Sequence, residues 1–242
     1  ARAAVAAADV GMPAIMKIAD ENGLLVIEDA AQSILGKISD KPVGSWGSTA
    51  CFSLHPLKNL NVWGDAGVIL TQSEQLAEDL RLLRNHGLKD RDHVSVFGHN
   101  SRLDSIQAVV GNRLINQANF ITEQRIRNAS KYDQSLKELK GLVSIPTRRA
   151  NVKHTYHLYM IRVTRRDELH RYLNERGVEA KIHYPIPVHL QEAARHLGYQ
   201  EGDFPVCESD CQSILTLPVH EHLTTEEADY TIDQIRLFYE HK

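Results

Sequence analysis

Apolar residues in the first half of the chain form short continuous runs that alternate with helical stripes. Runs of this length are typical of strands buried on both faces of a parallel sheet, so strands are expected at residues 24–27, 47–54 and 66–71. Helices are expected at residues 13–21 and 74–87, with a third that carries Ile106, Val109 and Val110. This alternation predicts an α/β layer in which helices flank a mainly parallel sheet.

Local signals mark the ends of these helices. Asn22 and Gly23 form a C-cap signal after the first helix. Ser73 is the expected N-cap residue of the second helix, and Asp104 or Ser101 can cap the third.

The pattern changes near residue 125, which we take as a domain boundary. A long helix at residues 121–139 leads into further strands at 154–163, 178–184 and 214–218. Further helices are expected at residues 166–176 and 204–213 and from residue 224 onward, where Thr224 or Thr225 with Glu227 fits a capping box. Residues 1–125 are therefore expected to form the α/β layer, and residues 126–242 a smaller α+β domain.

Composition limits the classes of function. The chain has 242 residues, of which 42% are hydrophobic and 24% charged, and this is ordinary for a globular protein with a buried core. A net charge of -3 without a dense basic cluster argues against nucleic acid as a partner, and no apolar run is long enough to span a membrane. The three cysteines show no metal-binding spacing, and their odd number without a secretory signal predicts a cytoplasmic protein.

Lys58 is the one formally charged side chain between Lys41 and Asp65. It follows an expected strand and lies in a loop with a proline before it and glycines after it. Partial burial lowers the pKa of a lysine amine, which can then attack carbonyl groups. The alternative to this reactive role is that Lys58 is a solvated loop lysine without a function in catalysis.

Two polar residues end strands that can be neighbours of one another in the sheet. Asp29 follows the first strand and Ser53 lies near the end of the second, at the edge where open α/β sheets bind ligands. An amine such as Lys58 and a carboxylate for the pyridine nitrogen are the two fixed needs of pyridoxal phosphate chemistry. Ser53 is a candidate hydroxyl for the phosphate. Taken alone, Asp29 is also explained as a helix cap or turn residue, and Ser53 as a strand hydroxyl.

Five ordered blocks carry a resemblance to a known family from about Gly11 to the C-terminus. They read VIEDAAQSILG, GSWGSTACFSLHPLKNLNVWGDAGVILT, LRNHG, GHNSRLDSIQAVVGNRL and LTLPVHEHLTTEE. Together they closely resemble the DegT/DnrJ/StrS-type sugar aminotransferases, which use pyridoxal phosphate on the aspartate aminotransferase fold. Residues 1–125 would then be the C-terminal portion of the cofactor-binding large domain, and residues 126–242 the small C-terminal domain.

The resemblance implies roles for individual residues. Lys58 matches the lysine that forms the Schiff base with the cofactor, and Asp29 matches the acid on the pyridine nitrogen. Gln32 matches the residue that lies against the cofactor ring, and Ser53 a hydroxyl on its phosphate. Asn100 matches an asparagine that reaches the phosphate in the neighbouring subunit of a homodimer with shared active sites.

The resemblance also implies a substrate loop and a reaction. The loop from His183 to His189 matches one that approaches the sugar, with His183 and Tyr184 as candidate contacts whose alternatives are an ordinary loop histidine and a packed aromatic. The implied reaction moves an amino group from an amino acid, glutamate or glutamine, to a keto sugar. No metal is implied.

Two departures from the family and two rival functions remain. Residues 64–67 read GDAG where many members read GEGG, and the N-terminal third is missing, so a fragment that is inactive alone is expected.

A sugar dehydratase of the same fold is a rival, although such enzymes carry a histidine at the position of Lys58. The other rival is a non-catalytic regulatory or binding protein.

Overall fold

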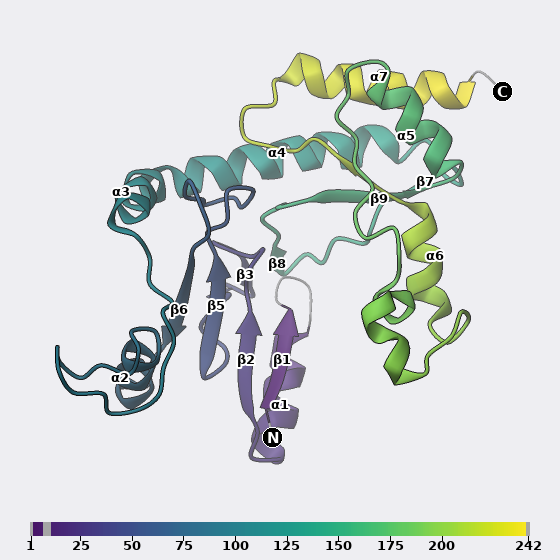
Figure 1. Cartoon of the computed structure of the whole chain (residues 1–242). Coiled ribbons are helices and arrows are strands. Elements are labelled where there is room, and N and C mark those ends of the chain that lie inside the picture. Colours follow the sequence, from purple (N-terminus) through teal and green to yellow (C-terminus); the bar gives the residue numbers. More distant parts are fainter. Residues whose placement is uncertain (1, 7–10, 241–242) are drawn as a thin grey trace. The chain divides into compact units, whose positions relative to one another are not determined.

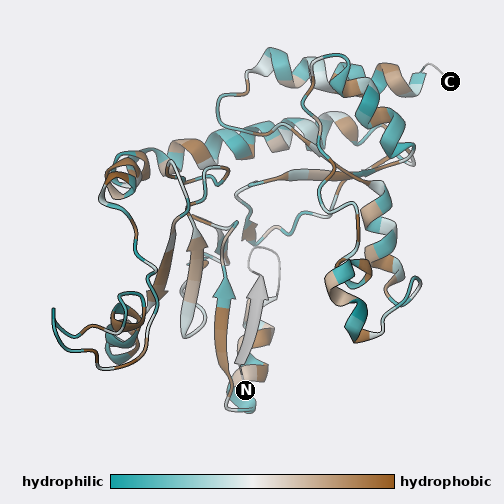
Figure 2. Ribbon diagram, in the orientation of Figure 1, coloured by the Kyte–Doolittle hydropathy of each residue, from teal (hydrophilic) through white to brown (hydrophobic). Residues whose placement is uncertain are grey.

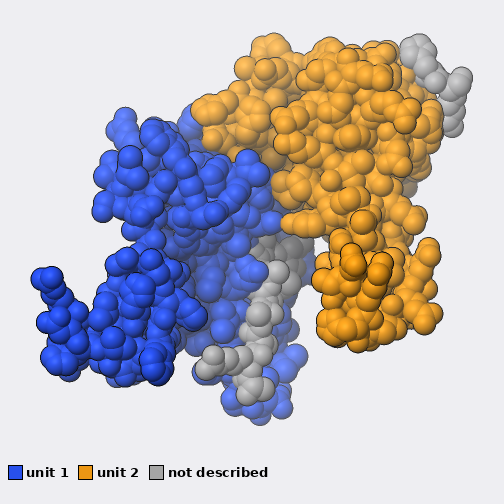
Figure 3. All heavy atoms as spheres, in the orientation of Figure 1, with its two compact units in different colours: residues 1–122, 149–157 blue, residues 123–148, 158–242 orange. Residues whose placement is uncertain are grey.

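The computed structural model describes residues 2–6 and 11–240 (Figure 1). The chain divides into two compact units (Figure 3). Unit 1 consists of residues 1–122 and 149–157, and unit 2 of residues 123–148 and 158–242. Residues 149–157 thus belong to unit 1, although they lie in the second half of the sequence.

A four-stranded sheet with the order β1-β2-β5-β6 forms the centre of unit 1 (Figure 1). Its strands are β1 (Arg2–Ala6), β2 (Leu25–Asp29), β5 (Thr49–Ser53) and β6 (Gly67–Thr71). The first three are parallel and β6 is antiparallel to β5, which confirms the mainly parallel sheet. In Figure 2, β2 is brown over most of its length and teal at its tip, where Glu28 and Asp29 end the strand.

Helix α1 (Met12–Glu21) packs on this sheet through an apolar stripe. Met12 and Ala19 form a buried cluster with Val26 of β2. The helix ends at Asn22, and Gly23 follows with a φ of 62°, as the C-cap signal predicts.

Smaller elements complete unit 1. A second sheet, with the order β4-β3-β8, consists of β3 (Lys37–Ile38), β4 (Lys41–Pro42) and β8 (Val152–Lys153), none of which the apolar pattern predicted. The helices are α2 (Glu74–Leu83), α3 (Ser105–Leu114), the 3₁₀ turn η1 (Ile115–Gln117) and the first residues of α4 (Ala118–Leu136). Ser73 caps α2, since its Oγ accepts from the Leu76 N–H at 3.2 Å. Asp104 is the N-cap residue of α3, but its side chain makes no capping bond.

Unit 2 is a small α+β unit with an antiparallel sheet of order β10-β9-β7. It also contains α4 from Glu123 onward. Its other strands and helices are β7 (Val143–Ser144), β9 (Tyr159–Val163), β10 (Ile214–Leu217), α5 (Arg166–Asn174), α6 (Pro205–Ser213), α7 (Thr225–Glu240) and the 3₁₀ helices η2 (Val188–Leu190) and η3 (Glu192–Leu197). The rings of Tyr172 and Phe238 lie 5.3 Å apart and join α5 to α7. The capping box of α7 forms with Thr224: Thr224 Oγ1 accepts from the Glu227 N–H, and Glu227 Oε2 accepts from the Thr224 N–H.

Two predicted strands of the second half need correction. Residues 178–184 form no strand, because only Lys181 pairs with a neighbour, Thr216, in an isolated bridge. The strand expected at 154–163 is β9 alone, since residues 154–157 belong to unit 1 and have no strand structure. Within residues 2–6 and 11–240, no helix combines the length and apolar character that crossing a bilayer requires.

Candidate active site

Asp29 is the last residue of β2 and lies opposite Cys51 of the parallel strand β5. Its side chain is exposed, and Oδ1 accepts from the Ala31 N–H at 3.1 Å. This hydrogen bond is the one expected if Asp29 is a turn residue, and it occupies one oxygen of the carboxylate. The other oxygen remains available for a ligand at the carboxyl end of the sheet.

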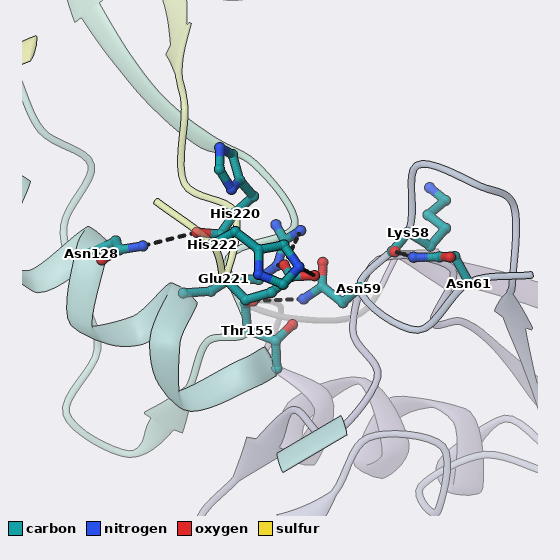
Figure 4. Close-up of polar contacts among 9 residues, drawn as sticks. Lys58, Asn59, Asn61, Asn128, Thr155, His220, Glu221 and His222 are labelled. Atoms are coloured by element: carbon teal, nitrogen blue, oxygen red, sulfur yellow. Dashed lines mark hydrogen bonds and ion pairs between the residues drawn. The ribbon is translucent and has the colours of Figure 1, made fainter. Parts of the chain in front are cut away.

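Lys58 lies in the loop that follows β5, and its side chain is half-buried. The loop is held locally, because the Lys58 N–H donates to the His55 carbonyl at 2.8 Å and the Lys58 carbonyl accepts from Asn61 Nδ2 at 2.9 Å (Figure 4). Partial burial lowers the pKa of the Lys58 amine, and the negative charge of Asp29 opposes that shift. The two side chains therefore interact electrostatically, although Asp29 ends β2 and Lys58 lies in the loop after β5.

The charge of Asp29 also acts on its neighbour across the sheet. The pKa of the Cys51 thiol is raised, first by burial and second by Asp29. Cys51 is thus a neutral thiol opposite Asp29, and it is not an activated nucleophile.

Ser53 and Gln32 lie beside this pair in unit 1. Ser53 ends β5, is half-buried, and accepts from the His55 N–H through Oγ at 3.3 Å, which leaves its hydroxyl proton for another acceptor. Gln32 is exposed, and its main-chain carbonyl accepts from Thr155 Oγ1 at 3.3 Å.

Asn100 lies in the loop between α2 and α3, where it forms a bridge with Asn85. Its Oδ1 accepts from Arg102 Nε at 3.0 Å, and Arg102 Nη1 donates to Asn85 Oδ1 at 3.2 Å. Arg102 thereby fixes the orientation of the exposed Asn100 amide, whose N–H groups remain free to donate.

The two weaker candidates belong to unit 2. His183 is half-buried, its Nδ1 is 2.8 Å from Thr216 Oγ1, and its pKa is lowered by burial and by Lys181. Tyr184 is 65% exposed and has a φ of 55°. His183 is thus held within its own unit, while Tyr184 is presented to solvent.

Glu28 is a residue that the sequence did not single out, although it precedes Asp29. Its side chain is fully buried and accepts three main-chain hydrogen bonds. Oε2 accepts from Gly44 at 2.7 Å, and Oε1 accepts from Trp46 at 2.7 Å and Gly47 at 2.8 Å. Glu28 thus ties the end of β2 to the turn before β5. The sequence feature that could have indicated this role of Glu28 is the glycine-rich stretch GSWGS at residues 44–48, which supplies the three N–H groups.

The apolar side of the lysine loop is buried. Leu54, Leu60 and Val62 form a cluster against which Ala66 packs. Ala66 is the alanine that departs from the family pattern at GDAG. Its methyl group packs against this cluster, and its carbonyl accepts from the Leu54 N–H at 2.9 Å, so the loop forms with alanine present.

Solved structures share this architecture. The S. venezuelae protein DesV, solved in complex with a ketimine intermediate, matches with a TM-score of 0.92 and 36% identity, over 96% of this chain and 62% of that chain. The fold is therefore the α/β fold of the pyridoxal-phosphate-dependent sugar aminotransferases.

The sequence comparison identifies the family. The model of the DegT/DnrJ/EryC1/StrS aminotransferase family matches residues 5–236, and the chain belongs to this family. A "Pleiotropic regulatory protein" of Geobacillus stearothermophilus is 41% identical over 95% of this chain and 62% of its own length. The dTDP-3-amino-3,4,6-trideoxy-alpha-D-glucose transaminase of Streptomyces venezuelae is 36% identical over 93% of this chain and 59% of its own length. The chain thus spans about three fifths of the length of these relatives.

Proposed function

We propose that the complete protein is a pyridoxal-phosphate-dependent aminotransferase that moves an amino group from glutamate or glutamine to a keto sugar, nucleotide-linked, in amino-sugar biosynthesis. The observation that carries the proposal is the half-buried Lys58 amine, whose pKa is lowered by burial and which lies in the field of Asp29 at the carboxyl edge of the sheet. Family membership and relatives named as dTDP- and UDP-sugar transaminases support the substrate class.

The residues of unit 1 fit the cofactor by the chemistry of their donors. Lys58 supplies a primary amine, Asp29 a carboxylate for the pyridine nitrogen, and Ser53 a hydroxyl for a phosphate oxygen. When bound, pyridoxal phosphate supplies a ring that takes up negative charge from the α-carbon of the amino acid. Gln32 is proposed to lie against that ring.

Lys58 and Asp29 then have distinct tasks. Lys58 Nζ, neutral once deprotonated, would take the proton from the α-carbon of the donor and pass it to C4′ of the bound cofactor in the same half-reaction. It would move a proton the opposite way when the keto sugar is aminated. Burial favours the neutral amine, and the negative charge of Asp29 opposes that effect. The Asp29 carboxylate keeps the pyridine nitrogen protonated. His183 and Tyr184 are proposed as contacts to the sugar.

The test is covalent capture of the cofactor. The complete protein with pyridoxal phosphate should be yellow, lose that colour with borohydride, and carry the label on Lys58. Lys58→Ala should abolish both labelling and transamination. Lys58→Arg is the matched control, because it keeps the charge but not the primary amine, and it should fail in the same way. Labelling that persists in Lys58→Ala would refute the assignment.

A homodimer with shared sites is the proposed working unit in the cytoplasm. Its support is the exposed Asn100, whose amide N–H groups can donate to a phosphate of the other subunit without adding charge. Complete Lys58→Ala and Asn100→Asp proteins, each inactive, should regain part of the activity when mixed, because one site of the mixed dimer then carries neither change. No regain after confirmed subunit exchange would place Asn100 in its own subunit's site.

A regulatory protein of the same fold is the second candidate, favoured by the name of the 41% identical relative. If the protein is regulatory, borohydride treatment of the complete protein with pyridoxal phosphate should leave no cofactor label on Lys58. A sugar dehydratase is disfavoured by the lysine at position 58. A complete protein that is not labelled on Lys58 and transfers no amino group to any keto sugar would favour the regulatory candidate.

A further inference from the structure

Residues 149–157, here called the clasp, belong to unit 1, although the residues on either side of them in the sequence belong to unit 2. The clasp contributes β8, which pairs with β3 in antiparallel register. Beside this pairing, the Ser39 N–H donates to the Asn151 carbonyl at 2.8 Å, and Asn151 Nδ2 donates to Ser39 Oγ at 3.1 Å. One end of the clasp is therefore anchored on the small second sheet.

The other end of the clasp is the buried Thr155, which bonds to both halves of the candidate site. Its carbonyl accepts from Asn59 Nδ2 at 2.8 Å (Figure 4). Its hydroxyl donates to the Gln32 carbonyl at 3.3 Å. Asn59 directly follows Lys58, and Gln32 ends the turn that begins at Asp29. A single residue thus joins the lysine loop to the aspartate turn.

Asn59 is suited to fix this loop. Its side chain is only 3% exposed, and within the part of the chain that the structure describes its Oδ1 has no hydrogen-bond partner, so the amide acts as a donor alone. The contacts of Lys58 with His55 and Asn61 are local and cannot set the position of the loop relative to Asp29. The long-range bond from Asn59, the residue after Lys58, to the Thr155 carbonyl can set that position.

We infer that Asn59 is a positioning residue, whose amide, held by the Thr155 carbonyl of the clasp, keeps the Lys58 amine half-buried and facing Asp29. The inference rests on the proposed function for the use made of that amine. The contacts that support it are independent of any cofactor.

The electrostatics give a measurable consequence. Asp29 from β2 is the charged group that acts on Lys58. The other titratable groups of the same loop, His55 and Asp65, lie 4.0 Å from each other. Burial is the larger influence on Lys58 and lowers its pKa. Without the Asn59 bond the loop can move into water, so the pKa of Lys58 should rise toward that of an ordinary lysine.

The experiment is an NMR titration of the 242-residue chain with its lysines ¹³C-methylated, in which Lys58→Arg assigns the Lys58 signal. Lys58 should titrate below the exposed lysines in the wild type and move up toward them in Asn59→Ala. Asn151→Ala is the matched control, because it removes an asparagine bond of the same clasp far from Lys58 in sequence. It should leave the Lys58 titration unchanged.

The inference is overturned if Lys58 titrates identically in the wild type and in folded Asn59→Ala, or if Asn151→Ala shifts it equally. If circular dichroism shows that Asn59→Ala does not fold, Asn59→Ser decides by the same two results, because serine fills part of the space but is too short to reach the Thr155 carbonyl. No cofactor enters this measurement, so its failure leaves the proposed function standing, and failure of the borohydride test leaves this result standing.

Discussion

Glu28→Gln should destabilise unit 1, although glutamine has nearly the same shape as glutamate. Glu28 is fully buried and accepts three main-chain N–H groups through its two oxygens. An amide has one oxygen. If that oxygen keeps the bonds to Trp46 and Gly47, the amide nitrogen meets the Gly44 N–H, and two donors face each other.

The magnitude follows from these contacts. One buried N–H without an acceptor costs about 1–3 kcal/mol, and two bonds to a neutral acceptor are each weaker by about 1 kcal/mol than bonds to a carboxylate. The neutral amide is easier to bury, which offsets part of the loss. We expect a net destabilisation of about 2 kcal/mol for Glu28→Gln. For Glu28→Ala, which strands all three donors, we expect about 3–5 kcal/mol.

The assay is urea unfolding of the chain at neutral pH, followed by tryptophan fluorescence. Both tryptophans, Trp46 and Trp63, lie in unit 1, so the signal reports on the unit that contains Glu28. Asp29→Asn is the matched control: Asp29 is exposed, and asparagine keeps an acceptor for the Ala31 N–H, so stability should change by about 0.5 kcal/mol or less. The reasoning fails if Glu28→Gln unfolds at the same urea concentration as this control.

Three further predictions concern single contacts. Asp29→Asn should lower the pKa of Lys58, because Asp29 stabilises the ammonium form, so amine labelling of Lys58 at a fixed mildly alkaline pH should become faster. Ser73→Ala should cost about 1 kcal/mol in urea unfolding, since it removes the cap of α2. Gly87→Ala should cost more than about 2 kcal/mol by the same assay, because φ is +71° and a Cβ would lie 1.6 Å from the Val96 carbonyl oxygen.

Each of these has a control in the same chain. Asp65→Asn removes a nearby exposed carboxylate and should leave Lys58 labelling unchanged; slower labelling in Asp29→Asn would reverse the assigned sign. Gln72→Ala, next to Ser73 and exposed, should be neutral. Gly141→Ala shares the positive φ but has open space around its Cβ, so it should cost less than Gly87→Ala.

Features set by neighbouring residues could be predicted from the sequence. The caps at Ser73 and Thr224 and the end of α1 depend on residues within one helical turn, and the structure has all three. Residues 178–184 show the limit of this approach. Whether such a segment becomes a strand depends on partners, and only Lys181 has one, at Thr216.

Burial of a polar residue was harder to predict. Glu28 looked like one of two acids at a strand end, and nothing in its neighbourhood distinguishes it from Asp29. The distinction comes from the turn at Gly44, Trp46 and Gly47, whose N–H groups converge on one side of β2 only. Adjacent residues of a strand point to opposite faces, so one acid is enclosed and the other stays exposed.

The same reasoning explains which partners of Lys58 could be predicted. Asp29 is distant from Lys58 in the sequence, yet it acts on Lys58 because β2 and β5 are parallel and their carboxyl ends meet at one edge. That rule holds for every parallel sheet, so the apolar runs were enough to suggest the pair. No comparable rule brings Thr155 to Asn59, 96 residues away. Their contact depends on how one segment of the second half returns to unit 1, and only the folded chain contains that information.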